Sequence, residues 1–69
     1  DAFNHPLVGR VYCESNGHTT RIVRADSHTL DTVEWWDSDR DNSWQRTINR
    51  RILEGGIKDG TIKELNYNG

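Results

Sequence analysis

The chain has 69 residues, with 9 Lys plus Arg against 11 Asp plus Glu, so its net charge is −2 with neutral His. This near balance does not favour a general affinity for phosphate backbones, which needs a basic field, and it is not acidic enough for mimicry of DNA. Apolar residues make up only 32% of the chain, so the core must be small. We therefore expect one domain over residues 1–69.

Cys13 is the only cysteine, so no disulfide can form within the chain. Small secreted domains with so little core usually carry disulfides, which favours a reducing, cytoplasmic location. The sequence has no apolar run long enough to span a membrane and no signal-peptide pattern. We accordingly expect no membrane partner.

Three strands are predicted in the first half of the chain, after a lead-in segment over residues 1–6. They cover Leu7 to Glu14, His18 to Ala25, and Leu30 to Asp37. Between the first two lies Asn16-Gly17, a strong hairpin signal because both residues tolerate positive φ. The sequence therefore predicts a three-stranded antiparallel meander.

The register of this meander follows if Asn16-Gly17 forms a two-residue loop. That loop sets Val11 opposite Ile22, and the next turn sets Ile22 opposite Val33. Opposite charges then face each other across strands, Arg24 with Asp31 and Arg21 with Glu34, which is a favourable arrangement. The predicted core face carries Leu7, Val11, Cys13, Ile22, Val33 and Trp35. The predicted outer face carries Arg10, Tyr12, Arg21, Val23, Glu34 and Trp36.

One amphipathic helix is predicted after the meander. Asn42 or Ser43 would cap it, and the apolar residues Trp44, Ile48 and Ile52 recur at intervals of four. Gly55-Gly56 would end the helix. A short last strand from Thr61 to Leu65 and a frayed tail over residues 66–69 complete the chain.

The expected fold class is therefore α+β: a three-stranded antiparallel meander followed by one amphipathic helix and a short last strand. The alternative is an SH3-like small β-barrel, which would follow if the helix were shorter.

The predicted outer face is the candidate binding surface, because Tyr and Trp beside Arg are the residue types enriched at interfaces. Tyr12 and Trp36 would be the anchors. The full candidate set is Arg10, Tyr12, Arg21, Glu34, Trp36, Arg46 and Arg50, with the last two on the helix at the rim. Two other interpretations remain open: a minor second core around Tyr12 and Trp36, and a stacking surface for bases or nucleotides.

Catalytic and metal-binding patterns are missing from the sequence. The run from Asp37 to Asp41 alternates oxygen ligands but lacks the glycine and closing glutamate of an EF-hand loop. His5, Cys13, His18 and His28 have no zinc-ligand spacing. Neither a nucleophile elbow nor a phosphate-cradling glycine loop occurs. We expect no catalytic residue, no metal and no cofactor.

Together these patterns predict a small, non-catalytic, intracellular binding protein of regulatory or inhibitor type. Its partner would be another protein or a second copy of itself, forming a homodimer. The alternative is a nucleic-acid or nucleotide binder that uses the aromatic and Arg face for stacking.

Overall fold

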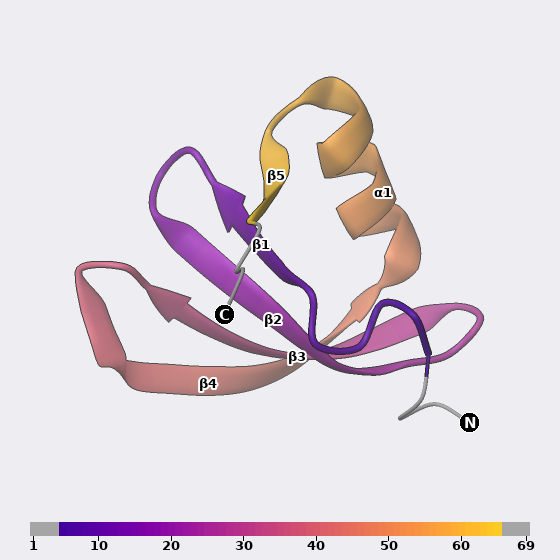
Figure 1. The fold of residues 1–69 in the computed structure, drawn as a ribbon, viewed down its shortest axis with the longest axis horizontal. Helices are drawn as coiled ribbons and strands as arrows, with labels where there is room; N and C mark the ends of the chain where they lie inside the picture. Colours follow the sequence, from indigo (N-terminus) through magenta and orange to yellow (C-terminus); the bar gives the residue numbers. More distant parts are fainter. Residues whose placement is uncertain (1–4, 66–69) are drawn as a thin grey trace.

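The computed structural model describes residues 5–65. Five strands form one antiparallel sheet in the order β4-β3-β2-β1-β5, and one helix joins β4 to β5 (Figure 1). The elements are β1 (Val11–Glu14), β2 (His18–Ala25), β3 (Thr29–Trp36), β4 (Asp39–Asn49), α1 (Arg50–Asp59) and β5 (Ile62–Leu65). The predicted fold class is therefore wrong: the protein is mostly sheet, not a three-stranded meander with a helix and a short strand. Strands β4 and β5 are the two edges and do not pair, so the sheet does not close into a barrel either.

The main error concerns residues 39–49, which form strand β4 where the sequence pattern predicted half of a helix. Apolar residues four apart share one face of a helix, but they also share one face of a strand, because four is a multiple of the strand period of two. Trp44 and Ile48 satisfy both patterns. The pairing of β4 along β3, from Thr29 opposite Asn49 to Trp36 opposite Asp39, decides in favour of the strand.

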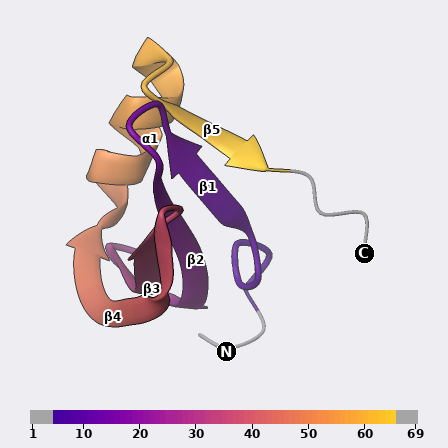
Figure 2. The ribbon, with the colours of Figure 1, turned by 90° about the vertical axis from the view of Figure 1, so that its left-hand side faces the viewer.

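Helix α1 begins later than predicted and runs through Gly55-Gly56. Asn49 is its N-cap, with Oδ1 accepting a hydrogen bond of 2.9 Å from the Arg51 backbone N–H. Gly60 ends it at φ 86°, a left-handed conformation that glycine adopts without strain. The helix packs against β5 and β4 (Figure 2). At Gly56 a Cβ would overlap the side chain of Ile62, so glycine permits the close approach of helix and strand.

The hydrophobic core lies between the sheet and α1. It consists of Tyr12, Ile22, Ala25, Leu30, Ile48 and Leu53, with Leu7, Val8 and Ile62 packed against it. Leu7 and Val8 belong to a turn closed by the Val8 N–H bond to the His5 carbonyl (3.0 Å), so the first strand is shorter than predicted.

The β1–β2 register differs by one residue from the predicted one, because the hairpin loop has three residues instead of two. Val11 pairs with Arg21, and Tyr12 pairs with Thr20. The Gly17 N–H bonds the Glu14 carbonyl (3.0 Å), and Gly17 itself has φ 89°, as in a turn followed by a left-handed bulge residue. A one-residue slip moves every side chain of a strand to the other face. Tyr12 therefore points into the core.

A second irregularity lies in β2 at Val23, where the pairing with β3 shifts between Ile22 and Arg24. Before this bulge Thr20, not Arg21, lies opposite Glu34, so the predicted Arg21–Glu34 pair does not form. Beyond it the predicted pairing is confirmed: Arg24 lies opposite Asp31, with Nη1 3.5 Å from Oδ2. The bulge and the slip together explain why the predicted faces were wrong.

Two further observations concern the ends and the helix. The predicted frayed tail over residues 66–69, and residues 1–4 of the lead-in segment, lie outside the described part of the chain. Within that part, no helix has the length and apolar character needed to cross a membrane.

Candidate functional site: an aromatic patch above a buried glutamate

Glu34, in the middle of β3, is fully buried on the helix side of the sheet. Its Oε2 accepts hydrogen bonds from the Thr32 hydroxyl (2.7 Å) and from Arg46 Nε (3.1 Å). Its Oε1 lies 2.7 Å from His18 Nε2. This last contact has ion-pair distance but not the alignment of a hydrogen bond, so Oε1 has no hydrogen-bond donor among the described residues.

Burying a carboxylate is costly unless it is paired and hydrogen-bonded, and removing one partner of a buried charge leaves that cost uncompensated. Strand pairing supplies the partners. Glu34 lies opposite Thr20 on β2 and Trp44 on β4, and His18 and Arg46 are two residues from these along the same strands, on the same face of the sheet. Glu34 therefore fixes side chains from three adjacent strands.

Three aromatic rings lie above this network. His18 is stacked on Trp44, with ring centroids 5.7 Å apart and planes at 14°, and it is tilted against Trp36 at 5.2 Å and 52°. The two indoles are 6.4 Å apart at 47°. We call His18, Trp36 and Trp44 the aromatic patch. His18 is buried, whereas 44% of Trp36 is exposed.

The shape of the patch suits a contact surface rather than a small-molecule pocket. The rings touch each other at distances typical of packed aromatic pairs, so no ligand fits between them. Beside them, between α1 and the sheet, lies a cavity of about 20 Å³ lined by His18, Arg46 and Ile52 among others. That volume is about the size that holds one water molecule.

The structure divides the predicted binding residues into four groups. Trp36, Arg46 and Glu34 come together at the patch, although Glu34 is buried beneath it. Tyr12 belongs to the core, so it cannot be an anchor on the surface. Arg21 is exposed on the opposite face of the sheet.

The remaining two predicted residues lie away from the patch. Arg10 precedes β1 and places Nη1 3.6 Å from Glu64 Oε1 on β5. Arg50 begins α1 and donates from Nη1 to the Asp26 carbonyl (2.9 Å). The predicted surface therefore does not exist as one face.

Sequence reasoning missed His18 and Trp44. His18 was predicted to begin the second strand, and Trp44 was placed on the apolar stripe of a helix. A usable signal was present: with β4 assigned as a strand, period-two alternation places Trp44, Arg46 and Ile48 on one face.

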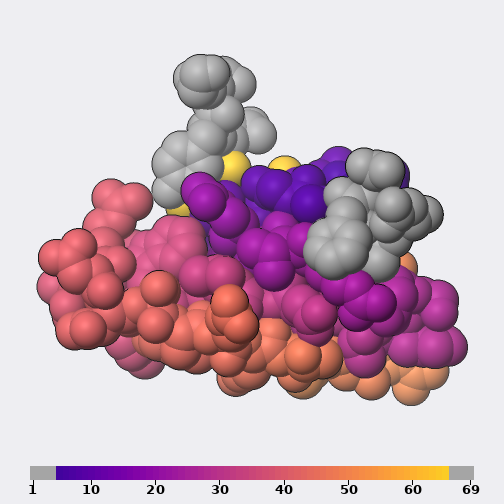
Figure 3. Space-filling view, turned by 90° about the horizontal axis from the view of Figure 1, so that it is seen from below, coloured from indigo at the N-terminus to yellow at the C-terminus, as the bar shows by residue number. Residues whose placement is uncertain are grey.

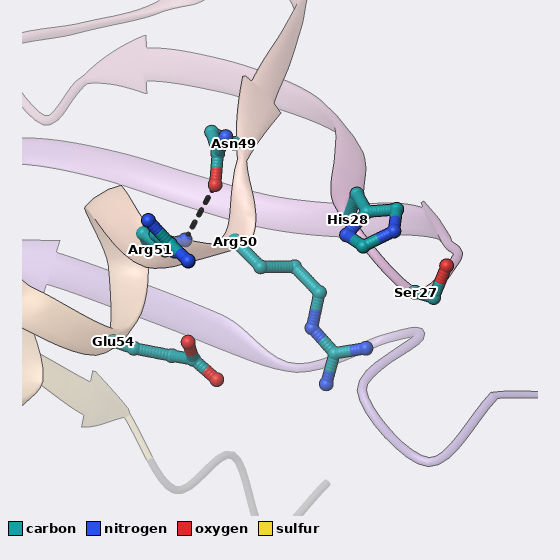
Figure 4. Close-up of a pocket in the computed structure, with 6 residues that line it drawn as sticks. All are labelled: Ser27, His28, Asn49, Arg50, Arg51 and Glu54. Carbon is teal, nitrogen blue, oxygen red and sulfur yellow. Dashed lines mark hydrogen bonds between the residues drawn. The ribbon is translucent and has the colours of Figure 1, made fainter.

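A larger depression lies at the start of α1, next to the β2–β3 turn (Figure 4). It measures about 510 Å³ and is lined by Ser27, His28, Asn49, Arg50, Arg51 and Glu54. Arg50 extends across it toward the turn, while Glu54 points into it from the helix. Because a carboxylate shares the depression with the arginines, its charge is mixed.

Among residues 5–65, three groups have pKa values displaced from their ordinary values. Backbone and side-chain hydrogen bonds from Thr29 and the backbone N–H of His28 lower the pKa of Asp26 to about 2. Hydrogen bonds from Thr61 lower the pKa of Asp59. A hydrogen bond with Tyr12, followed by the charge of Glu64, raises the pKa of Arg10. All three belong to turns or exposed pairs, and none lies in the aromatic patch.

No group of three or more His, Cys, Asp or Glu side chains suited to a metal ion occurs within residues 5–65. Comparisons with protein-family models, with curated proteins and with solved structures found no match for this chain.

Proposed function

We propose that this chain is a small, non-catalytic docking domain that contacts other protein chains through the aromatic patch. The observation that carries the proposal is Trp36: a large indole, 44% exposed, held against two other rings above a buried ion network. Tryptophan is the residue type most often found at the energetic centre of protein interfaces.

Rigidity of the patch supports this proposal. A partner that binds a mobile side chain must immobilise it, at a cost of about 0.5–1.5 kcal/mol for each rotamer-rich side chain. Here His18 is fixed from below by Glu34 and from the side by Trp44. Trp36 packs against His18. The entropy of fixing its side chain is therefore partly lost on folding and not on binding.

The surroundings of Trp36 also resemble an interface, which has an apolar centre and a polar rim. The Arg46 side chain is 52% exposed and retains donors beyond the Nε that binds Glu34. Ile52 on α1 is 57% exposed and lies on the other side of the small cavity. Cys13 is the only cysteine and is unpaired, which favours an intracellular, reducing setting for this role.

Substitution of Trp36 by Ala tests the proposal. We expect the fold to persist and partner binding to weaken by about 2 kcal/mol, which is about 30-fold in Kd. The matched control is Val23→Ala, because Val23 is an apolar residue of similar exposure, 37%, at the β2 bulge outside the patch. Both variants and the wild type would be used as baits in extracts of the source, and the captured proteins then titrated as purified components.

Capture that survives Val23→Ala and is lost with Trp36→Ala supports the proposal. Equal binding by all three baits contradicts it. The salt dependence of any complex separates a protein partner from a nucleic acid, because phosphate contacts weaken log-linearly with salt and an apolar contact weakens only slightly.

A further inference from the structure

Within residues 5–65, no strand pairs with the outer edge of β4. Strand β4 is the first in the order β4-β3-β2-β1-β5, and nine of its eleven residues are exposed. Figure 3 shows its side chains, in coral and orange, along one long margin of the molecule. An exposed edge strand presents unpaired N–H and C=O groups that can pair with another strand.

The alternation of an antiparallel ladder identifies which backbone groups face outward. The Arg50 N–H bonds the His28 carbonyl (2.9 Å) at the end of the β3–β4 pairing. Bonded positions alternate in such a ladder, so Trp44, Arg46 and Ile48 direct their backbone groups to β3. Gln45, Thr47 and Asn49 direct theirs outward.

Natural edge strands are usually protected by proline, lysine, bulges or charges. The N-terminal part of β4 has two such protections. Its pairing with β3 is irregular between Glu34 and Trp36. It also carries three charged residues, Asp39, Arg40 and Asp41. The segment 44–49 has a regular register with β3 and contains no Pro, Gly or Lys. Arg46 is its single charged residue.

Charge along this edge is self-complementary in the antiparallel sense. Asp39 and Asp41 flank Arg40 at its beginning and leave that end with a net negative charge, and Arg46, Arg50 and Arg51 lie toward its end and just beyond it. Two copies of β4 running in opposite directions place the acidic end of each near the basic end of the other. Opposite charges across strands are favourable, so this arrangement selects a second copy over an unrelated strand.

We propose that the chain forms a homodimer by antiparallel pairing of β4 with β4 of a second copy, with Gln45 opposite Gln45 at the two-fold axis. This inference goes beyond the proposed function, because the paired edge contains Trp44 of the aromatic patch but not Trp36. In this register Trp44 of each copy lies opposite Arg46 of the other, a favourable cation–π pairing. Moving the centre to Arg46 would set two like charges directly opposite each other, which is unfavourable.

Proline at position 45 tests the pairing without removing a contact within the sheet. Gln45→Pro deletes an outward N–H, and edge strands accept proline where that group faces solvent. We expect Gln45→Pro to be monomeric. Its thermal unfolding midpoint should match that of wild-type chains diluted until they are monomeric. Gln45→Ala keeps the N–H and stays dimeric. Sedimentation equilibrium would follow the change from twice the chain mass of 8.0 kDa to the chain mass itself.

A disulfide test fixes the register. In a Cys13→Ala background, Gln45→Cys places two thiols opposite each other, and mild oxidation then yields a covalent dimer. Thr47→Cys is the matched control, because Thr47 shares the face and exposure of Gln45 but would lie opposite Ser43 of the second copy. We expect at least tenfold less covalent dimer from Thr47→Cys.

A wild-type chain that stays monomeric at every concentration overturns this inference, and so does a dimer that Gln45→Pro leaves intact. Equal cross-linking at positions 45 and 47 overturns the register. If the chain is monomeric but Trp36→Ala still abolishes capture of another protein, the proposed function stands and the homodimer is wrong.

Discussion

Glu34 and His18 lie on neighbouring strands, with Oε1 of the buried carboxylate 2.7 Å from Nε2 of the imidazole. The contact joins the interior of the sheet to its surface, because the same imidazole is stacked on Trp44 and tilted against Trp36. A fully buried carboxylate thereby contacts the ring against which both indoles of the patch are packed.

Replacing Glu34 by Gln should destabilise the protein although the two side chains have nearly the same shape. A neutral glutamine amide cannot compensate the positive charge of Arg46. Its NH₂ group would also face one of the groups that now donate hydrogen bonds to the Glu34 carboxylate. We expect a loss of about 2 kcal/mol, below the value for a fully buried pair because Arg46 is half exposed. Urea unfolding measures it.

Glu64→Gln is the control for this substitution. Glu64 pairs with Arg10 at 3.6 Å, and both side chains are more than 40% exposed. Exposed pairs contribute little to stability, so the urea midpoint should stay where it is. Equal effects of the two substitutions would show that the buried network does not stabilise the fold.

The two adjacent glycines of α1 should respond in opposite ways to alanine. Gly56→Ala forces a Cβ against Ile62 of β5, and overpacking of this kind costs about 1–3 kcal/mol. At Gly55 there is open space around the added Cβ, so Gly55→Ala should stabilise the helix by about 0.5–1 kcal/mol. Thermal unfolding of both variants measures the contrast, and a stabilised Gly56→Ala would contradict the packing of α1 on β5.

The start of α1 predicts a difference between two asparagines. Asn49 caps the helix, so Asn49→Ala should cost about 1 kcal/mol. Asn42 lies in β4, and its Nδ2 donates to Asp39 Oδ2 in an exposed contact of 2.8 Å. Asn42→Ala should therefore leave the unfolding free energy nearly unchanged. The reverse ranking would place the beginning of the helix near residue 42 after all.

The contribution of the β2–β3 turn to stability should fall only in strong acid, because it depends on the charge of Asp26. Because the folded pKa of Asp26 is lowered from 3.8 to about 2, its carboxylate stabilises the folded state above pH 3.8. That stabilisation is lost as the pH falls through about 2. An NMR titration of the Asp26 carboxyl carbon should give a midpoint near the lowered value, and the stability difference between wild type and Asp26→Ala should vanish there. A midpoint at 3.8 would show that the turn does not hold the charge.

Part of this fold could be predicted because residue-level signals were strong. Strand β2 occupies His18–Ala25 as expected, β3 is shifted by one residue, and the Arg24–Asp31 pairing was predicted correctly. Trp36 is exposed as expected, but it lies on the helix side of the sheet and not on the outer face where the pattern placed it. These predictions depended on local propensity and on pairing across a short turn.

The faces could not be predicted because they depend on single-residue details. Asn16-Gly17 is compatible with loops of two or three residues, and the difference reverses the faces of β1. The bulge at Val23 has no signature in the sequence, since Val is a typical strand residue. Glu34 was placed on the outer face by the predicted register, which set it opposite Arg21. Its burial depends on His18, Thr32 and Arg46, which only the three-dimensional pairing brings together.

The most direct test of docking through the aromatic patch is fluorine NMR of the chain labelled with 5-fluorotryptophan. Spectra are recorded as a partner, or more of the chain itself, is added. The resonances of Trp36 and Trp44 should shift with association, while that of Trp35, on the other face of the sheet, should stay in place. Association that shifts the resonance of Trp35 and leaves that of Trp36 unchanged would contradict the docking surface proposed here.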